Sequence, residues 1–168
     1  MNEQITSVDP TLLQTATDLI LKECKKNGKV FIAGNGGSAA IASHVAVDFT
    51  KNTPVKAMNF NEADLITCLA NDYGYEHWVE KAIELYARKN DVVILISSSG
   101  KSKNIINAAF KAREMGLKLI TFSGFDANNP LRKTGHMNFW VDSKVYNVVE
   151  ITHHVWLLAM VDKMVADQ

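Results

Sequence analysis

A run of serines near the middle of the chain has the composition of an anion-binding loop. The stretch reads VILISSSGKS over residues 93–102. Its hydroxyl side chains are Ser97, Ser98, Ser99 and Ser102. We expect a strand to end and a helix to begin here, and the N–H groups at a helix N-terminus attract anions. The loop therefore predicts a phosphate site, although a serine-rich helix cap without a ligand has a similar composition.

The last three letters of this stretch, GKS, also close the P-loop of nucleotide-binding proteins. That pattern is G-x-x-x-x-G-K-[ST]. Its first glycine would fall at position 95, which is Leu95, inside the apolar run. A loop does not begin in the middle of a buried strand, so an ATP or GTP site of this kind is excluded. Lys101 then either points to solvent or adds positive charge near the phosphate.

A second loop, GNGGS at residues 34–38, is rich in glycine and also precedes an expected helix. Glycine lets the backbone turn sharply and approach a ligand closely. The dinucleotide-binding fingerprint needs a third glycine three positions after Gly36, and Ala39 stands there instead. Taken alone, the loop is also consistent with a tight turn that packs a helix against a strand.

Side chains that could transfer protons are found in two expected helices. His44 and Asp48 are four positions apart and therefore share one helix face. Glu150 lies three positions before His153 and four before His154, so either histidine can face the same way as the carboxylate. Such pairs suit general acid–base catalysis. The structural alternative is a histidine bonded to Asp48, with the two later histidines in the core or in a subunit contact.

The spacing of apolar residues predicts strands that alternate with helices. Short apolar runs predict strands at residues 29–34, 57–60, 91–97, 117–124 and 137–143. Helical spacing predicts helices at about 9–27, 38–51, 62–74, 75–90, 102–116 and 147–166. We therefore expect an α/β, three-layer αβα fold in one domain over residues 1–168, with a doubly wound five-stranded parallel sheet. Such sheets bind ligands at the carboxyl ends of their strands, where both loops fall.

Charge and composition argue against several classes of partner. The 18 basic and 18 acidic residues cancel, so there is no overall basic surplus to attract nucleic acid or membrane. No run of about 18 apolar residues predicts a membrane span. The first ten residues, MNEQITSVDP, lack the basic and apolar regions of a secretory signal. We expect a cytoplasmic protein that binds neither nucleic acid nor membrane directly.

Three segments in the same order carry a resemblance to a known family. They read GNGGSAAIASHVAVDF, NDYG and ISSSGKSKNI, and the resemblance extends over roughly residues 10–165. The chain resembles the sugar isomerase (SIS) domain family, and within it the phosphoheptose isomerases. The resemblance implies a five-stranded parallel sheet between helices, a phosphorylated sugar as ligand, and a homodimer or homotetramer with sites near subunit contacts.

The resemblance also implies roles for individual residues. Ser97, Ser99 and Ser102, with Ser98 at a neighbouring position, match the loop that holds the sugar phosphate. The sugar-contacting positions match Asn35, Gly36, Ser38 and Asp72. His44 and Asp48 fall on a histidine and a glutamate that serve catalysis, or a metal, in the family.

The closing helix departs from the family pattern. Val149 and Leu157 stand where the family has a glutamine and a histidine, so we expect no bound metal and no cofactor. We expect Asp48 to act as base with His153 or His154 as its partner, Glu150 orienting or sharing the role, and His44 bonded to Asp48. The implied activity is aldose–ketose isomerisation of sedoheptulose 7-phosphate or a similar ketose phosphate. The alternative is a non-catalytic phosphosugar-binding or protein-interaction module of the same fold.

Overall fold

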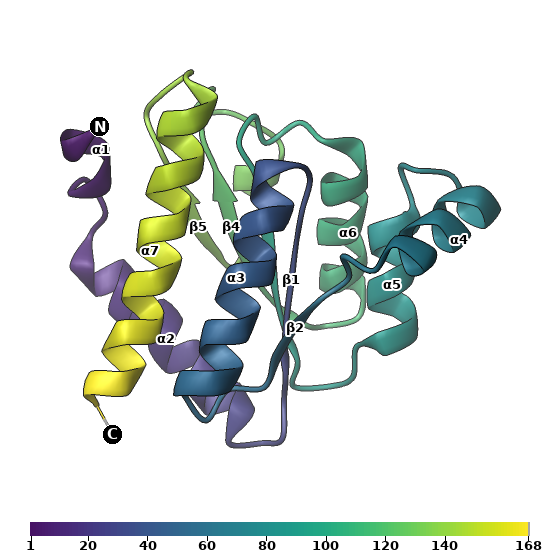
Figure 1. The fold of residues 1–168 in the computed structure, drawn as a ribbon, viewed down its shortest axis with the longest axis horizontal. Coiled ribbons are helices and arrows are strands. Elements are labelled where there is room, and N and C mark those ends of the chain that lie inside the picture. Colours follow the sequence, from purple (N-terminus) through teal and green to yellow (C-terminus); the bar gives the residue numbers. More distant parts are fainter. Residues whose placement is uncertain (168) are drawn as a thin grey trace.

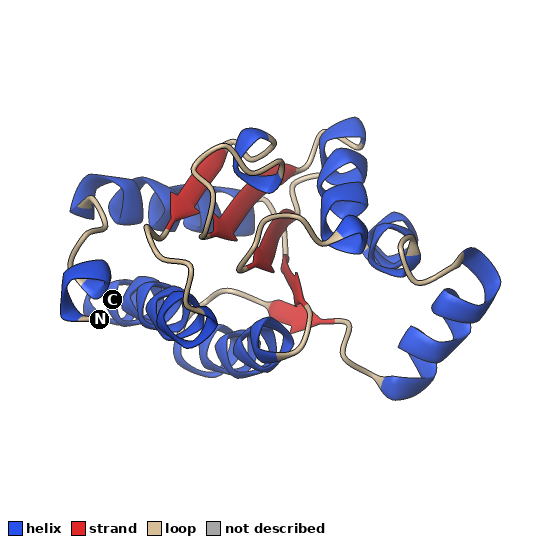
Figure 2. Cartoon of the chain, turned by 90° about the horizontal axis from the view of Figure 1, so that it is seen from above, coloured by secondary structure: helices blue, strands red, loops and turns tan. Residues whose placement is uncertain are grey.

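The computed structural model describes residues 1–167 and contains one five-stranded sheet in which every strand pair is parallel. The spatial order is β2-β1-β3-β4-β5. The strands are β1 (Val30–Gly34), β2 (Ala57–Asn59), β3 (Val92–Ser97), β4 (Lys118–Ser123) and β5 (Met137–Trp140). Figure 2 shows helices on both sides of this sheet. The predicted α/β, three-layer fold is confirmed, while residue 168 of the expected domain lies outside the described residues.

Two separate cores form because successive strand residues face opposite sides of the sheet. In β1, Val30 and Ile32 belong to one apolar cluster, and Phe31 belongs to the other. In β3, Ile94 and Leu95 divide in the same way. Strands that are buried on both faces read as continuous apolar runs, which is why the sequence identified β1 and β3 clearly.

The first core is covered by α2 (Pro10–Cys24), α3 (Gly37–Asn52) and α7 (Tyr146–Ala166). The second is covered by α5 (Trp78–Tyr86) and α6 (Lys103–Glu114), with α4 (Ala63–Tyr73) beside α5. In Figures 1 and 2, α4 lies at one end of the molecule, away from the sheet. The remaining elements are the short α1 (Asn2–Ile5) and the 3-10 turn η1 (Leu131–Lys133).

The helix boundaries follow local signals, with the largest differences at α2 and α5. The helix predicted at 75–90 is shorter at both ends, since α5 spans Trp78–Tyr86. Asp9 caps α2 as expected, because its carboxylate accepts from the Thr11 N–H at 2.8 Å. The predicted end near residue 27 is too late, since α2 ends at Cys24 and the chain tightens into a turn with Asn27 at a φ of 64°. The closing helix was expected at 147–166 and begins one residue earlier. Within residues 1–167, no helix is both long and apolar enough to span a bilayer.

Candidate functional site

Sheet topology brings the two predicted loops together. β1 and β3 are hydrogen-bonded neighbours, and the last residue of β1, Gly34, is in register with Ile96 of β3. The chain leaves β1 for the β2 edge and leaves β3 toward β4, so the strand order reverses between them. This switch point is where open α/β sheets hold ligands, because the two loops diverge there and leave a crevice.

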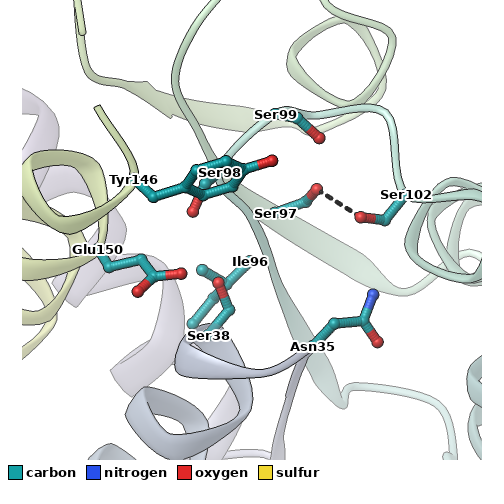
Figure 3. Close-up of a pocket in the computed structure, with 9 residues that line it drawn as sticks. All are labelled: Asn35, Ser38, Ile96, Ser97, Ser98, Ser99, Ser102, Tyr146 and Glu150. Atoms are coloured by element: carbon teal, nitrogen blue, oxygen red, sulfur yellow. Dashed lines mark hydrogen bonds between the residues drawn. The ribbon is translucent and has the colours of Figure 1, made fainter. Parts of the chain in front are cut away.

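A cavity of about 110 Å³ opens at this switch point (Figure 3). Its walls come from both loops, from the end of β3 and from the start of α7. They are Asn35, Ser38, Ile96, Ser97, Ser98, Ser99, Ser102, Tyr146 and Glu150. A hollow of about 360 Å³ shares Asn35 and Ser102 with the cavity, and continues it toward Tyr75 and Lys103. The structure therefore brings together most of the residues that the sequence assigned to substrate binding.

Hydrogen bonds within the serine loop, residues 97–102, fix it in a curved conformation that we call the cradle. Gly100 has a φ of 63°, which favours glycine, and its N–H donates to the carbonyl of Ser97 at 2.9 Å. The hydroxyl of Ser97 donates to that of Ser102 at 3.1 Å, which links the two ends of the loop (Figure 3). The Ser99 hydroxyl accepts from the Lys101 N–H at 3.2 Å.

Ser98 supplies the clearest sign that the cradle is built for a ligand. Its side chain lines the cavity and is 5% exposed, yet its hydroxyl has no hydrogen-bond partner within the described chain. Buried polar groups in native proteins are nearly always satisfied, since leaving one unpaired costs about 1–3 kcal/mol. A ligand oxygen in the cavity would satisfy it.

The glycine loop is fixed by a pair of amides. Asn35 and Asn104 exchange two hydrogen bonds, at 2.9 and 2.8 Å, which tie the start of α3 to the start of α6. The Tyr75 hydroxyl also donates to the Asn35 amide oxygen at 3.2 Å. Gly36 adopts a φ of 54° as the residue that caps α3, and it is not among the residues that line the cavity. Ser38 follows in the first turn of α3 and faces the cavity.

Glu150 is the one carboxylate that lines the cavity within residues 1–167. It reaches the N-terminal turn of α3, where a Cβ added to Gly37 would overlap its carboxylate oxygens. The lack of a side chain at Gly37 thus leaves room for the Glu150 carboxylate beside the first turn of α3. In Figure 3 the carboxylate points toward Ser38, across the cavity from the serine loop.

The other predicted proton-transfer residues lie elsewhere. His44, Asp48 and His154 form a cluster on the outer surface of α3 and α7 and do not line the cavity. Nδ1 of His44 and Nε2 of His154 are 2.8 Å apart, and Nε2 of His44 is 3.4 Å from the Asp48 carboxylate. Partial burial, and next the nearby His44 charge, hold the pKa of His154 below its ordinary value, while Asp48 opposes this.

His153 requires a correction, because it is a core residue. Its side chain is fully buried, and its Nε2–H donates to the carbonyl of Ser123 at 3.0 Å. Burial lowers the pKa of His153 to about 4, with the bond to Ser123 acting against the shift. A neutral imidazole enclosed by Phe122 and Trp156 is not placed to exchange protons with a ligand in the cavity.

Asp72 requires a second correction. It lies near the end of α4, exposed, where its carboxylate accepts from its neighbour Asn71 at 2.9 Å. It does not line the cavity, and Tyr75 instead reaches Asn35 from this part of the chain. The sequence reasoning also missed Tyr146, which lines the cavity next to Glu150. The spacing of four from Glu150 was a usable signal, since residues four apart share a helix face.

The donor set does not fit a metal of the kind that the resemblance suggested. Val149 and Leu157, at the positions of two expected ligands, are both fully buried in the core. Across the part of the chain that the structure describes, no three His, Cys, Asp or Glu side chains are arranged to hold a metal ion.

Comparison with known proteins gives a consistent picture. The SIS domain family matches residues 2–124. A phosphoheptose isomerase of Thermodesulfovibrio yellowstonii is 33% identical over 160 residues, which cover 91% of this chain and 79% of that protein. One from Helicobacter pylori strain P12 is 36% identical over 121 residues, or 68% of this chain and 63% of that protein. The chain thus matches about three fifths of the length of that relative, and 62% of the one from Histophilus somni.

Solved structures agree with the sequence matches. Phosphoheptose isomerase GmhA from Neisseria gonorrhoeae superposes with a TM-score of 0.88 at 28% identity, covering 97% of this chain and 91% of that one. A phosphoheptose isomerase from Francisella tularensis superposes with a TM-score of 0.90 over 99% and 91% of the two chains. At 22% identity, this second likeness supports the fold alone.

Proposed function

This chain belongs to the SIS domain family, and from that premise we propose that it is an aldose–ketose isomerase of a phosphorylated sugar, most simply sedoheptulose 7-phosphate. The observation that carries the proposal is the cavity itself, with a cradle of serine hydroxyls on one side and the Glu150 carboxylate on the other. The first side suits a phosphate and the second a proton transfer, and an isomerase of phosphosugars needs both.

In this proposal the sugar phosphate lies in the serine loop. The N-terminal dipole of α6 and four hydroxyls stabilise its charge, those of Ser97, Ser98, Ser99 and Ser102. The unpaired Ser98 hydroxyl thereby gains a partner. Binding of the phosphate fixes the distance between the reacting carbons and Glu150, so that part of the binding energy is used to orient the sugar for reaction.

Glu150 then moves a proton between two neighbouring carbons. Its carboxylate removes the proton from C1 of the ketose, the C–H electron pair forms a C1=C2 double bond, and O2 takes up a proton to give an enediol. Return of the proton to C2, with loss of the proton on O1, completes the aldose. Ser38 lines the same cavity on the Glu150 side (Figure 3), and in this proposal its hydroxyl relays the proton between O1 and O2.

We also propose that the chain works as a homodimer or homotetramer that meets through α3 and α7. Val47, Ile151 and Val155 are exposed apolar side chains on these helices, and the cluster of His44, Asp48 and His154 lies among them. In such an assembly this cluster would lie at the contact between copies. The expected cytoplasmic location stays a prediction.

A non-catalytic phosphosugar-binding module is the second candidate. The observation that favours it is the closing helix, where Val149 and Leu157 are buried apolar residues at positions expected to be polar. Both candidates share the cradle, so binding alone does not separate them. Glu150 separates them, because only the isomerase needs a base.

The test is exchange of solvent deuterium into C1 of sedoheptulose 7-phosphate. Glu150→Gln should slow exchange by about 10²–10⁴-fold, the usual contribution of a general base, while phosphosugar binding persists. Glu114→Gln, which removes an exposed carboxylate paired with Lys111, is the matched control and should exchange at the wild-type rate. Wild-type protein that binds the sugar but never exchanges its proton would leave the binding module as the function.

A further inference from the structure

Asn129 is a fully buried amide behind the serine loop, and it belongs to none of the elements that line the cavity. It lies between β4 and η1. Its Nδ2 group donates to the Asp126 carbonyl at 2.8 Å, the Ser123 hydroxyl at 3.1 Å and the Gly124 carbonyl at 3.2 Å. Its Oδ1 accepts from the Arg132 N–H at 2.9 Å. The amide therefore organises the whole turn after β4.

This turn is in direct contact with the serine loop. The Gly124 N–H donates to the Ser98 carbonyl at 2.9 Å, and the Leu131 N–H donates to the Gly100 carbonyl at 3.2 Å. These two backbone bonds lie on either side of Asn129 in the sequence. Through these two bonds, the conformation of the turn after β4 constrains the conformation of the serine loop.

Gly100 and Asn129 are also matched in shape. A Cβ added to Gly100 would overlap the amide of Asn129, so the backbone of the serine loop lies directly against this side chain. Gly100 is the residue with a φ of 63° that reverses the loop between Ser99 and Lys101. The amide thus supports the loop at its sharpest bend.

We propose that Asn129 is a positioning residue for the phosphate cradle, which it shapes through Gly100 and Gly124 without touching the ligand. The inference rests on the proposed function, since it assigns the serine loop to phosphate. It predicts that loss of the amide lets the loop widen, so that the hydroxyls no longer converge. Affinity for the anion then falls, while the Glu150 side of the cavity keeps its geometry.

The main test compares Asn129→Ala with Asn138→Ala. Asn138 makes a similar set of bonds, with the Thr121 hydroxyl and both backbone groups of Gly135, but it lies on β5 and away from the cradle. Asn129→Ala should raise the Kd for inorganic phosphate and the KM for the ketose phosphate by about tenfold, the equivalent of one weakened hydrogen bond to a charged group, with kcat within about threefold of wild type. Asn138→Ala should lower the melting temperature but leave both constants unchanged.

Gly100→Ala provides an internal check on the contact. Alone it should weaken phosphate binding, and part of this loss should disappear when Asn129 is also alanine, because the side chain that the new methyl group meets is gone. Additive effects of the two substitutions would count against a direct contact and overturn the proposal.

Hydrogen exchange of the loop amides keeps the inference separate from the activity. In Asn129→Ala, the N–H groups of Ser99, Gly100 and Lys101 should exchange faster than in wild type and in Asn138→Ala. If wild-type protein binds no phosphosugar, the proposed function falls, and faster exchange in Asn129→Ala would still support Asn129 as the residue that positions this loop. If binding is normal and exchange in this loop is the same in both variants, Asn129 has no positioning role.

Discussion

The fully buried His153 should make the fold sensitive to mild acid, and one substitution should remove much of that sensitivity. Burial lowers the pKa of His153 from an ordinary value of 6.5 to about 4, so the unfolded chain takes up a proton between these values that the folded chain does not. The unfolded state therefore binds more protons in this window, and stability falls as the pH falls. One pH unit corresponds to about 1.4 kcal/mol, which gives a loss of about 2 kcal/mol by pH 5 and about 3 kcal/mol by pH 4.

The measurement is the free energy of unfolding by urea at several pH values from 7 to 4. A domain of this size has an m-value of roughly 2 kcal/mol per molar urea, so His153 alone should move the midpoint by about 1–1.5 M across the window. His153→Gln keeps an N–H that can donate to the Ser123 carbonyl but does not titrate. Its unfolding free energy should depend less steeply on pH than that of wild type, whatever its value at pH 7.

His136→Gln is the matched control. Partial burial, and next the positive charges of Arg113 and Lys118, also lower the pKa of His136, but this ring is far more accessible than that of His153. The control should keep most of the wild-type dependence. Parallel curves for wild type and His153→Gln would refute the reasoning, because they would mean that His153 is protonated as readily in the fold as in the unfolded chain.

Three further outcomes follow from the site. Phosphate and ketose phosphates should raise the melting temperature. Ser97→Ala combined with Ser99→Ala should abolish this shift, since each hydroxyl contact to a charged group contributes about 1.5–3 kcal/mol. A shift specific to ATP with magnesium would contradict the assignment of the serine loop to a sugar phosphate. Gly37→Ala should lower turnover more than phosphate affinity, because its methyl group would displace the Glu150 carboxylate. Steady-state kinetics would measure turnover and calorimetry would measure phosphate affinity. Equal losses of turnover and affinity would contradict this reasoning. Val155→Glu should shift the protein toward monomer in light scattering, whereas a wild-type monomer at micromolar concentration would remove the proposed contact.

The strands and both candidate ligand loops could be predicted because their signals are local. A continuous apolar run such as Val92–Ser97 specifies a strand covered on both faces, and the residues that follow it mark the strand end. Parallel pairing then places strand ends at one edge of the sheet, so the loops after Gly34 and Ser97 had to be close if β1 and β3 were neighbours. The sequence alone therefore predicts that the two polar loops lie at the carboxyl edge of the sheet.

The facing of helix residues could not be predicted in the same way. In α7, apolar side chains occur all round the helix, so the sequence gives little contrast between the face toward the sheet and the face toward solvent. Glu150 and His153 are three apart, and yet one lines the cavity and the other is enclosed in the core. The position of Asp72 could not be predicted for a different reason. It depends on how far α4 lies from the sheet, and no local sequence pattern determines that distance.

Helix α7 has a mechanical consequence. Glu150 lies near the start of α7 and lines the cavity, and Val155 is exposed five residues later, about 1.4 turns or 7.5 Å along the axis. A helix moves almost as a rigid body over such a length. A displacement or rotation of α7 at Val155 therefore also displaces the carboxylate of Glu150. A substitution that shifts α7 at its exposed face would therefore also move the carboxylate of Glu150, the proposed base.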